Sequence, residues 1–251
     1  MVIEMDSKFT NDKDLMFLYN CSNDNLKLLV DILAYDKDGE ARLTEELTTN
    51  YDFKKSYPNN IKAILPLVIN ELQCFGGNTI LNMFRGHGVH YREILIKVCK
   101  QYKVNFNKDA SVDLMEKYLL QKILLMAAEK MTDEDVKHLG DVHTRTKDML
   151  VKNIGSFHVG DPLIIKMVTT LVIEVAKKNG LKVLGGFAAK FASGRFFAIL
   201  TGPVGWAATA AWTLFDVAGP AFRVMIPATI AVAYLRIISQ KTEDELNNLF
   251  K

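Results

Sequence analysis

The sequence contains one long stretch without charge, residues 196–215, which reads FFAILTGPVGWAATAAWTLF. A run of this length suffices for one membrane-spanning helix, but Gly202 and Pro203 interrupt it near its start. A second apolar block, residues 224–235, is bounded by an arginine on each side and is too short to cross a bilayer alone. The two blocks together predict a tight helical hairpin, packed either inside a helical domain or in a membrane.

The charge balance of the chain excludes a general attraction to nucleic acid. Lys and Arg total 31 against 29 Asp and Glu, a net charge of +2, and 49% of the 251 residues are hydrophobic. Residues 181–240 differ from this average, with five positive charges and one negative: Lys182, Lys190, Arg195, Asp216, Arg223 and Arg236. Such a local excess suits an anionic lipid surface or an acidic partner, and equally the solvated ends of helices.

The cysteines and the N-terminus both indicate an intracellular protein. Cys21, Cys74 and Cys99 are scattered, so they predict neither a disulfide framework nor a zinc knuckle. Residues 1–14 carry acids where a secretory signal carries bases followed by an apolar core. We therefore expect a cytoplasmic location, with any membrane contact made peripherally on the inner face.

Apolar residues recur at helical intervals through most of the chain, and no convincing series of strands is present. Ser22 is the expected N-cap of one helix, and the segment from Thr132 to Asp135 has the character of a capping box. The expected helices cover residues 12–19, 22–33, 61–75 with Pro66 inside, 91–102, 111–130 and 162–178, with a short one opening at 43–47. These patterns predict an all-α fold, a helical bundle.

Changes in composition divide the chain into three predicted regions. Loop-forming residues concentrate at 153–162, and the chain is rich in Gly, Ala and aromatic residues beyond Leu181. We predict a small N-terminal helical module (1–55), a central helical domain (56–155) and a glycine-rich apolar C-terminal hairpin region (156–251). Small residues at every fourth position in the third region let helices approach closely, in lipid or in a soluble bundle. The soluble bundle is favoured because the chain has no long uninterrupted span.

The densest group of polar residues and glycines lies at 71–95, ELQCFGGNTILNMFRGHGVHYREIL. An enzymatic interpretation takes His87 or His90 as a general acid or base, with Arg85 or Arg92 holding an anion. A structural interpretation has the charged residues pair with one another while the glycines around His87 form a tight corner. It is favoured because the chain has no nucleophile elbow or phosphate loop, so no catalytic residue is predicted. The candidate binding or structural residues are Glu71, Gln73, Gly76, Gly77, Arg85, Gly86, His87, Gly88, Tyr91 and Arg92.

Neither a metal nor a cofactor is predicted. The pair His87 and His90 and the pair His138 and His143 lack the HExxH pattern, and solvent-facing histidines explain both pairs. The glycine pair at 185–186 is not a dinucleotide-binding fingerprint, since no strand precedes it and its third glycine is missing.

Gly-Pro pairs mark the corners of the predicted hairpin. The membrane interpretation places Trp206, Trp212 and Tyr234 at a bilayer interface, whereas the favoured alternative places them in the aromatic core of a soluble bundle. The residues predicted to define the hairpin, and to face a membrane or a partner, are Gly202, Pro203, Gly205, Trp206, Trp212, Gly219, Arg223 and Pro227.

Two blocks of the sequence, residues 71–95 and 202–236, resemble the YaaW-type family of uncharacterised bacterial proteins. Residues 14–33 are similar to the short N-terminal module of that family, so the likeness covers nearly the whole chain apart from about residues 107–181. The family has been grouped with the ubiquinol–cytochrome c chaperone-like domain, whose members help to assemble a respiratory complex. The resemblance implies an all-helical fold and a binding or assembly role rather than catalysis.

These observations favour a non-enzymatic helical interaction or assembly factor with a protein partner, whose C-terminal hairpin docks that partner or the membrane surface. Two alternatives stay open. One is a membrane-acting effector that inserts residues 196–235, and the other is an unrecognised enzyme centred on His87. The sequence leaves the identity of the partner and the oligomeric state undetermined.

Overall fold

The computed structural model describes residues 11–36, 38–42, 47–76, 88–139, 144–178, 180 and 221–249. Within these ranges the chain is helical, and its only β-type pairing is an isolated bridge between Tyr35 and Ala41. The predicted all-α fold is therefore confirmed. The 3₁₀ helices are η1 (Lys13–Asn20) and η2 (Ile61–Ile64), and the α-helices are α1 (Asn23–Ala34), α2 (Tyr51–Ser56), α3 (Leu65–Gly76), α5 (Tyr91–Gln101), α6 (Val112–Ala128), α7 (Asp133–His138), α8 (Lys147–Ser156), α9 (Pro162–Lys178), α13 (Phe222–Ser239) and α14 (Glu243–Asn248).

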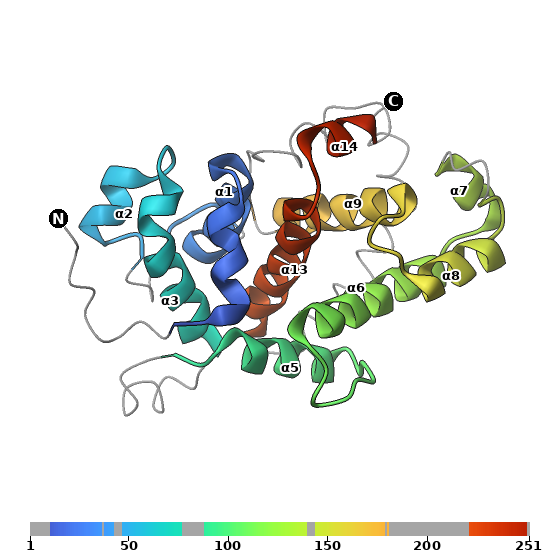
Figure 1. Cartoon of the computed structure of the whole chain (residues 1–251), viewed down its shortest axis with the longest axis horizontal. Coiled ribbons are helices and arrows are strands. Elements are labelled where there is room, and N and C mark those ends of the chain that lie inside the picture. Colours follow the sequence, from blue (N-terminus) through green and yellow to red (C-terminus); the bar gives the residue numbers. More distant parts are fainter. Residues whose placement is uncertain are drawn as a thin grey trace.

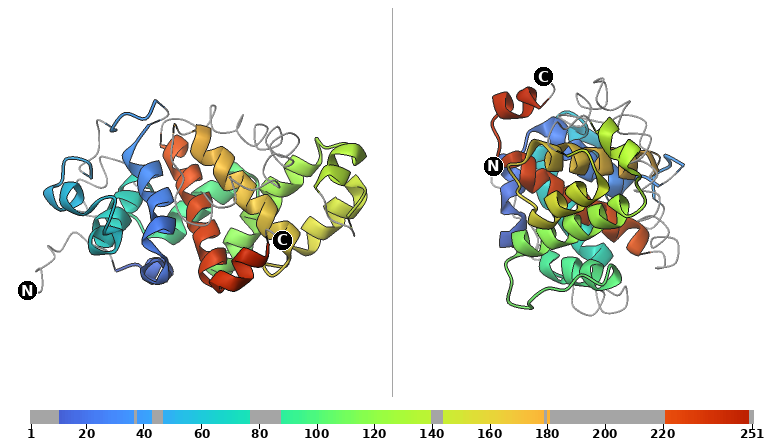
Figure 2. Two further views of the ribbon diagram at one scale, coloured as in Figure 1. Left: turned by 90° about the horizontal axis from the view of Figure 1, so that it is seen from above. Right: turned by 90° about the vertical axis from the view of Figure 1, so that its right-hand side faces the viewer.

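Helix α13 crosses the middle of the molecule (Figure 1). It contacts η1, α1, α3, α5, α6 and α9, so helices surround it on several sides. Its residues are apolar on all faces rather than along one stripe, which is the pattern of a helix buried in a core. Figure 2 shows that α2 lies at one end of the elongated molecule and that α7 and α8 lie at the other.

By length and composition α13 is also the one described helix that could cross a membrane, with a mean hydropathy of 1.5. In the folded chain 78% of that segment is buried inside the protein. The apolar block at residues 224–235 forms the middle of this helix, which continues through Arg236 to Ser239. It can do so because the charge of Arg236 is neutralised by a partner inside the protein.

The N-terminal segment forms two helices with different periods. In η1, Asp12, Leu15 and Leu18 are buried while Met16 and Tyr19 are exposed, a spacing of three that suits a 3₁₀ helix. Helix α1 then begins as predicted, since the Ser22 hydroxyl accepts from the backbone N–H of Asn25 at 3.2 Å. The short helix expected at 43–47 lies almost entirely outside the described residues.

The single helix expected over residues 61–75 is wrong at its start. The structure has a separate 3₁₀ turn, η2, followed by α3 from Leu65. Pro66 therefore stands in the first turn of α3, where a backbone N–H has no intrahelical acceptor and its absence costs nothing.

Three of the later helices begin where the sequence predicts. Thr132 forms a capping box with Asp135, in which the Thr132 hydroxyl accepts from the Asp135 N–H at 3.2 Å and the Asp135 carboxylate accepts from the Thr132 N–H at 2.8 Å. Asp161 accepts from the N–H of Leu163 at 2.8 Å, directly before Pro162 opens α9. Helix α6 follows Ser111, although that hydroxyl makes no capping bond.

One hydrophobic core joins helices from all three predicted regions. Leu29 of α1, Leu95 of α5 and Ile230 of α13 are each at most 1% exposed and belong to the same cluster. The boundaries near residues 55 and 155 stay predictions.

Candidate functional site

A buried ion pair joins the last turn of α13 to α6. The Nε of Arg236 lies 2.6 Å from Oε2 of Glu116, and Nη2 of Arg236 donates to Oε1 at 3.2 Å. Nη2 also donates to the backbone carbonyl of Asp14 at 2.7 Å, and the ring of Phe17 lies 4.0 Å from the guanidinium carbon. Arg236 thereby connects the C-terminal helix to α6 and to η1.

Burial controls the ionisation of this cluster. Removal from water raises the pKa of Glu116, and neither the Arg236 guanidinium nor the Tyr91 hydroxyl fully offsets that effect. The Tyr91 hydroxyl donates to Oε1 of Glu116 at 2.8 Å, and burial together with this carboxylate raises the pKa of Tyr91 well above its usual value. The tyrosine therefore stays protonated and acts as a donor.

Asp12 is the centre of a second group of buried hydrogen bonds, which shares Tyr91 with the Arg236–Glu116 group. Its Oδ2 accepts from the backbone N–H of Tyr91 at 2.6 Å and from Nε2 of Gln73 at 3.2 Å. Nδ1 of His90 lies 3.7 Å from the same oxygen, with the His90 side chain 52% exposed. Asp12 thus ties the first residue of α5 to α3 and caps η1 through the N–H of Asp14.

Of the predicted glycine-rich corner around His87, the structure describes only Gly88. The N–H of Val89 donates to the carbonyl of Gln73 at 3.2 Å, and a Cβ on Gly88 would lie 2.6 Å from the backbone nitrogen of Cys74. A Cβ on Gly76 would lie 2.7 Å from Cγ2 of Val89. Only residues without a side chain permit this approach of the backbone before α5 to α3.

Of the remaining candidate residues in segment 71–95, the structure describes Glu71 and Arg92. Glu71 is buried in α3 and has an interaction partner. The guanidinium of Arg92 donates to the carbonyl of Lys108 and so anchors the loop that precedes α6. Gly77, Arg85, Gly86 and His87 lie outside the described residues, and the enzyme centred on His87 stays a hypothesis.

Of the predicted hairpin residues, the structure describes Arg223 and Pro227. Arg223 is exposed near the start of α13, and Pro227 is buried within that helix. The remaining ones lie outside the described residues: Gly202, Pro203, Gly205, Trp206, Trp212 and Gly219. Tyr234 is 1% exposed, in agreement with the favoured interpretation that placed it in an aromatic core.

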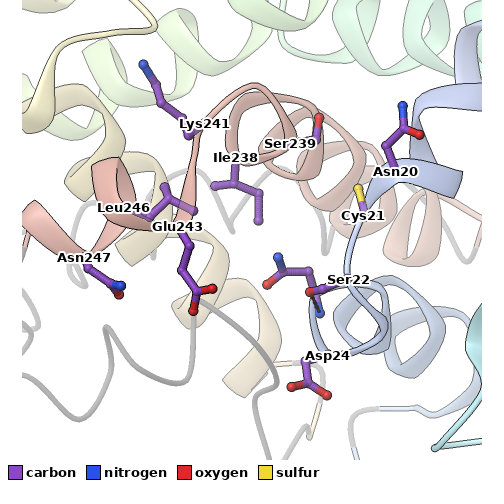
Figure 3. A pocket seen from close by; sticks show the side chains of 11 residues that line it. Asn20, Cys21, Ser22, Asp24, Ile238, Ser239, Lys241, Glu243, Leu246 and Asn247 are labelled. Atoms are coloured by element: carbon purple, nitrogen blue, oxygen red, sulfur yellow. Dashed lines mark hydrogen bonds between the residues drawn. The ribbon is translucent and has the colours of Figure 1, made fainter.

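A cleft of about 310 Å³ lies between the junction of η1 with α1 and the junction of α13 with α14. Residues 20–25, between η1 and α1, form one wall, and residues 238–247, from α13 to α14, form the other (Figure 3). Its floor is apolar through Ile238 and Leu246, and its sides carry amides, hydroxyls and carboxylates: Asn20, Ser22, Asp24, Asn25, Ser239, Glu243 and Asn247. The carboxylates of Asp24 and Glu243 belong to opposite walls of the cleft, and the ammonium of Lys241 points away from both.

The groups that line this cleft suit recognition more than reaction. Burial raises the pKa of Cys21 to about 11, which keeps it a thiol at neutral pH and a poor nucleophile. The Ser22 hydroxyl is engaged in capping α1. Neither residue has the adjacent base that activates a nucleophile, within the ranges the structure describes.

Sequence reasoning missed the charged residues that organise the core, namely Asp12, Glu116 and Arg236. A usable signal exists for two of them. Glu116 stands four residues before Leu120 on the buried side of α6, and Arg236 directly follows an apolar run. A charge on an apolar face predicts a buried partner, but the pattern does not identify which residue that partner is.

Comparison with known proteins places the chain among bacterial relatives. It is 36% identical to a UPF0174 protein of Helicobacter pylori strain J99, over 95% of this chain and 96% of the relative. It is 32% identical to the UPF0174 protein YaaW of Escherichia coli K12, over 95% of this chain and the whole of that relative. Residues 9–43 match the model of a domain of unknown function, DUF3944, which covers η1 and α1. No solved structure matches the chain.

Proposed function

The chain belongs to the UPF0174 family, and we propose that it is a non-enzymatic helical interaction or assembly factor that binds another protein through the cleft between the η1–α1 and α13–α14 junctions. The observation that carries this proposal is the composition of that cleft. Amide, hydroxyl and carboxylate groups surround an apolar floor, and the one thiol among them is protonated at neutral pH.

The chemistry of the cleft specifies the kind of partner. Side-chain amides such as Asn25 and Asn247 both donate and accept, as a peptide backbone requires. Asp24 and Glu243 add two negative charges, one from each wall of the cleft. The partner segment that fits best is an extended polypeptide with a Lys or Arg and a small apolar side chain for the floor.

The use of buried charge elsewhere in the molecule supports a binding role. Each buried carboxylate of the described chain already has a partner within the protein: Asp12, Asp31, Glu71 and Glu116. A general acid or base has to exchange its proton with a substrate, whereas these groups hold helices together. The grouping of the YaaW-type family with the ubiquinol–cytochrome c chaperone-like domain implies an assembly role and is the second ground for the proposal.

The proposed location is the cytoplasm, with any membrane contact peripheral. The membrane-acting alternative requires residues 196–235 to insert together, so α13 would have to leave its contacts with α1 and α9. Leakage of dye from anionic vesicles, measured with the intact chain, distinguishes the two. Leakage that saturates with protein concentration would support the effector and contradict the proposal.

Site-specific crosslinking tests the proposed partner. A photoreactive residue at Asn247, an exposed position on the cleft, should yield one discrete adduct in cells. The same residue at Lys100 is the matched control, because Lys100 is exposed on α5, at the edge of the molecule opposite α14 (Figure 1). The adduct should appear only with the probe at Asn247, and its partner should be identified by mass spectrometry.

Reconstitution from purified components completes the test. Asp24→Asn combined with Glu243→Gln should weaken binding of the identified partner by about ten-fold or more, because charge-assisted hydrogen bonds are lost. Asp109→Asn with Glu129→Gln, both exposed and outside the cleft, should leave binding unchanged. Equal binding by both double variants, or identical adducts from both probe positions, would remove the proposal.

A further inference from the structure

A second cavity, of about 300 Å³, lies between α6 and α13 and shares no lining residue with the cleft described above. Its apolar lining includes Leu120, Phe157, Ala233 and Ile237, all of which are buried. The loop between α8 and α9 contributes Val159, which is half-buried. This volume is at the lower end of the range for small-molecule sites, so a ligand here would have only a short apolar body.

The polar groups of the cavity include one cationic side chain from each helix. Arg236 lines the cavity from α13, and Lys117 lines it from α6. Nε and Nη2 of Arg236 are used by Glu116 and by the Asp14 carbonyl, while Nη1 makes no hydrogen bond within the described part of the chain. The side chain of Arg236 is 16% exposed, so water or a ligand can reach this unused edge.

The two acidic residues that line the cavity, Glu116 and Asp113, do not occupy Nη1 of Arg236. Both oxygens of Glu116 already accept hydrogen bonds, from Arg236 and from Tyr91. Asp113 is exposed in the first turn of α6, where water screens its charge and the positive end of the helix balances it. Lys117 is half-buried and makes no ion pair among the described residues. An anionic group at the cavity would therefore meet two cationic donors.

We propose that the cavity between α6 and α13 binds a small amphipathic carboxylate, which accepts from Nη1 of Arg236 and Nζ of Lys117 and packs its apolar body against Leu120, Phe157 and Ile237. This site is separate from the cleft of the proposed function. Its occupant would add a second bridge between α6 and α13, and binding would therefore raise the thermal stability of the whole chain.

Titration of the full chain with hexanoate tests the proposal, with calorimetry to measure affinity and thermal melting to measure stabilisation. Hexanoate should bind at one saturable site and raise the Tm. 1-Hexanol, which keeps the apolar body without the charge, should bind about ten-fold more weakly or worse, and hexylamine weaker still. Equal binding of hexanoate and 1-hexanol, or no binding of hexanoate, would overturn the proposal.

Two pairs of variants locate the site without disturbing the ion pair of Arg236. Val159→Phe should fill the cavity and abolish hexanoate binding, whereas Val104→Phe, also a half-buried loop position but outside the cavity, should not. Lys117→Gln should weaken binding several-fold, whereas Lys122→Gln on the same helix should not. Hexanoate binding that survives Val159→Phe, in a variant with a normal melting transition, would place the ligand elsewhere and contradict the assignment.

Discussion

Arg236 and Glu116 form a two-point ion pair between positions 120 residues apart, with Nε 2.6 Å from Oε2 and Nη2 3.2 Å from Oε1. The pair stands where α13, α6 and η1 meet, because the same guanidinium bonds the carbonyl of Asp14. The polar interior is therefore organised by the C-terminal helix, whose other residues are almost all apolar.

Loss of the Arg236 guanidinium should strongly destabilise the folded protein. We expect Arg236→Met to lower the free energy of unfolding by about 3 to 5 kcal/mol, because it leaves the buried Glu116 without its counter-charge. Combining it with Glu116→Gln removes both charges and keeps an acceptor for Tyr91, so the double variant should be more stable than Arg236→Met alone. Urea denaturation of the wild type, the two single variants and the double variant forms a double-mutant cycle, which measures the coupling energy between Arg236 and Glu116.

The same helix provides a control for this cycle. Arg223 is exposed near the start of α13, so Arg223→Met should change the stability by no more than about 0.5 kcal/mol. A similar loss of stability in Arg223→Met and Arg236→Met would mean that positive charge on α13 stabilises the fold without the specific pair with Glu116.

The close approach at Gly88 predicts a steric cost. In Gly88→Ala the new Cβ would lie 2.5 Å from the carbonyl oxygen of Gln73, which is backbone and cannot rotate away. We expect a loss of about 1 to 3 kcal/mol in the free energy of unfolding, measured by urea denaturation. Gly155→Ala is the control, since a Cβ at that exposed helical position meets nothing within 4 Å and should stabilise by about 0.5 kcal/mol.

Asp31 predicts how stability depends on pH. It is 4% exposed, forms an ion pair with Lys27 and accepts from the hydroxyl of Tyr57, which stacks on Phe53 at 5.0 Å. Burial nevertheless raises the pKa of Asp31 above its ordinary value of 3.8, more than Lys27 and Tyr57 lower it. The folded protein therefore holds a proton on Asp31 at a pH where the unfolded chain has already released it.

This linkage has a definite sign. As the pH falls through the folded pKa of Asp31 toward 3.8, the group should add stability that is absent at neutral pH. The stability of the wild type relative to Asp31→Asn should therefore increase as the pH falls through that range, measured as the difference in urea midpoints. A difference that shrinks with falling pH would show that attraction to Lys27 outweighs burial.

The central position of α13 predicts the effect of truncating its side chains. Ile230 is completely buried, so Ile230→Ala should cost about 2 to 5 kcal/mol through lost contacts and the cavity left behind. Met149→Ala, at a side chain that is 51% exposed, should cost well under 1 kcal/mol. Thermal or urea unfolding measures both losses. Similar losses in the free energy of unfolding for Ile230→Ala and Met149→Ala would contradict a core position of α13.

Part of the candidate site could be predicted from the sequence. The pattern at 71–95 favours a structural cluster. Within the described residues Gln73 and Tyr91 each bond Asp12, and Gly88 lies against the backbone of α3. The acids that complete the cluster, Asp12 and Glu116, could not be predicted. Their partners are distant in the sequence, with Gln73 61 residues from Asp12 and Arg236 120 from Glu116.

The sequence by itself determined the helical class and most helix starts, because a cap or a period of 3.6 depends on residues within one turn of each other. Ser22, Thr132 and Asp161 show this, since each bonds an N–H two or three residues ahead. Only the tertiary structure decided that the apolar block at 224–235 is a core helix surrounded by protein, and that its arginine at 236 is paired. A local pattern records how apolar a helix is, while its surroundings depend on which distant segments pack around it.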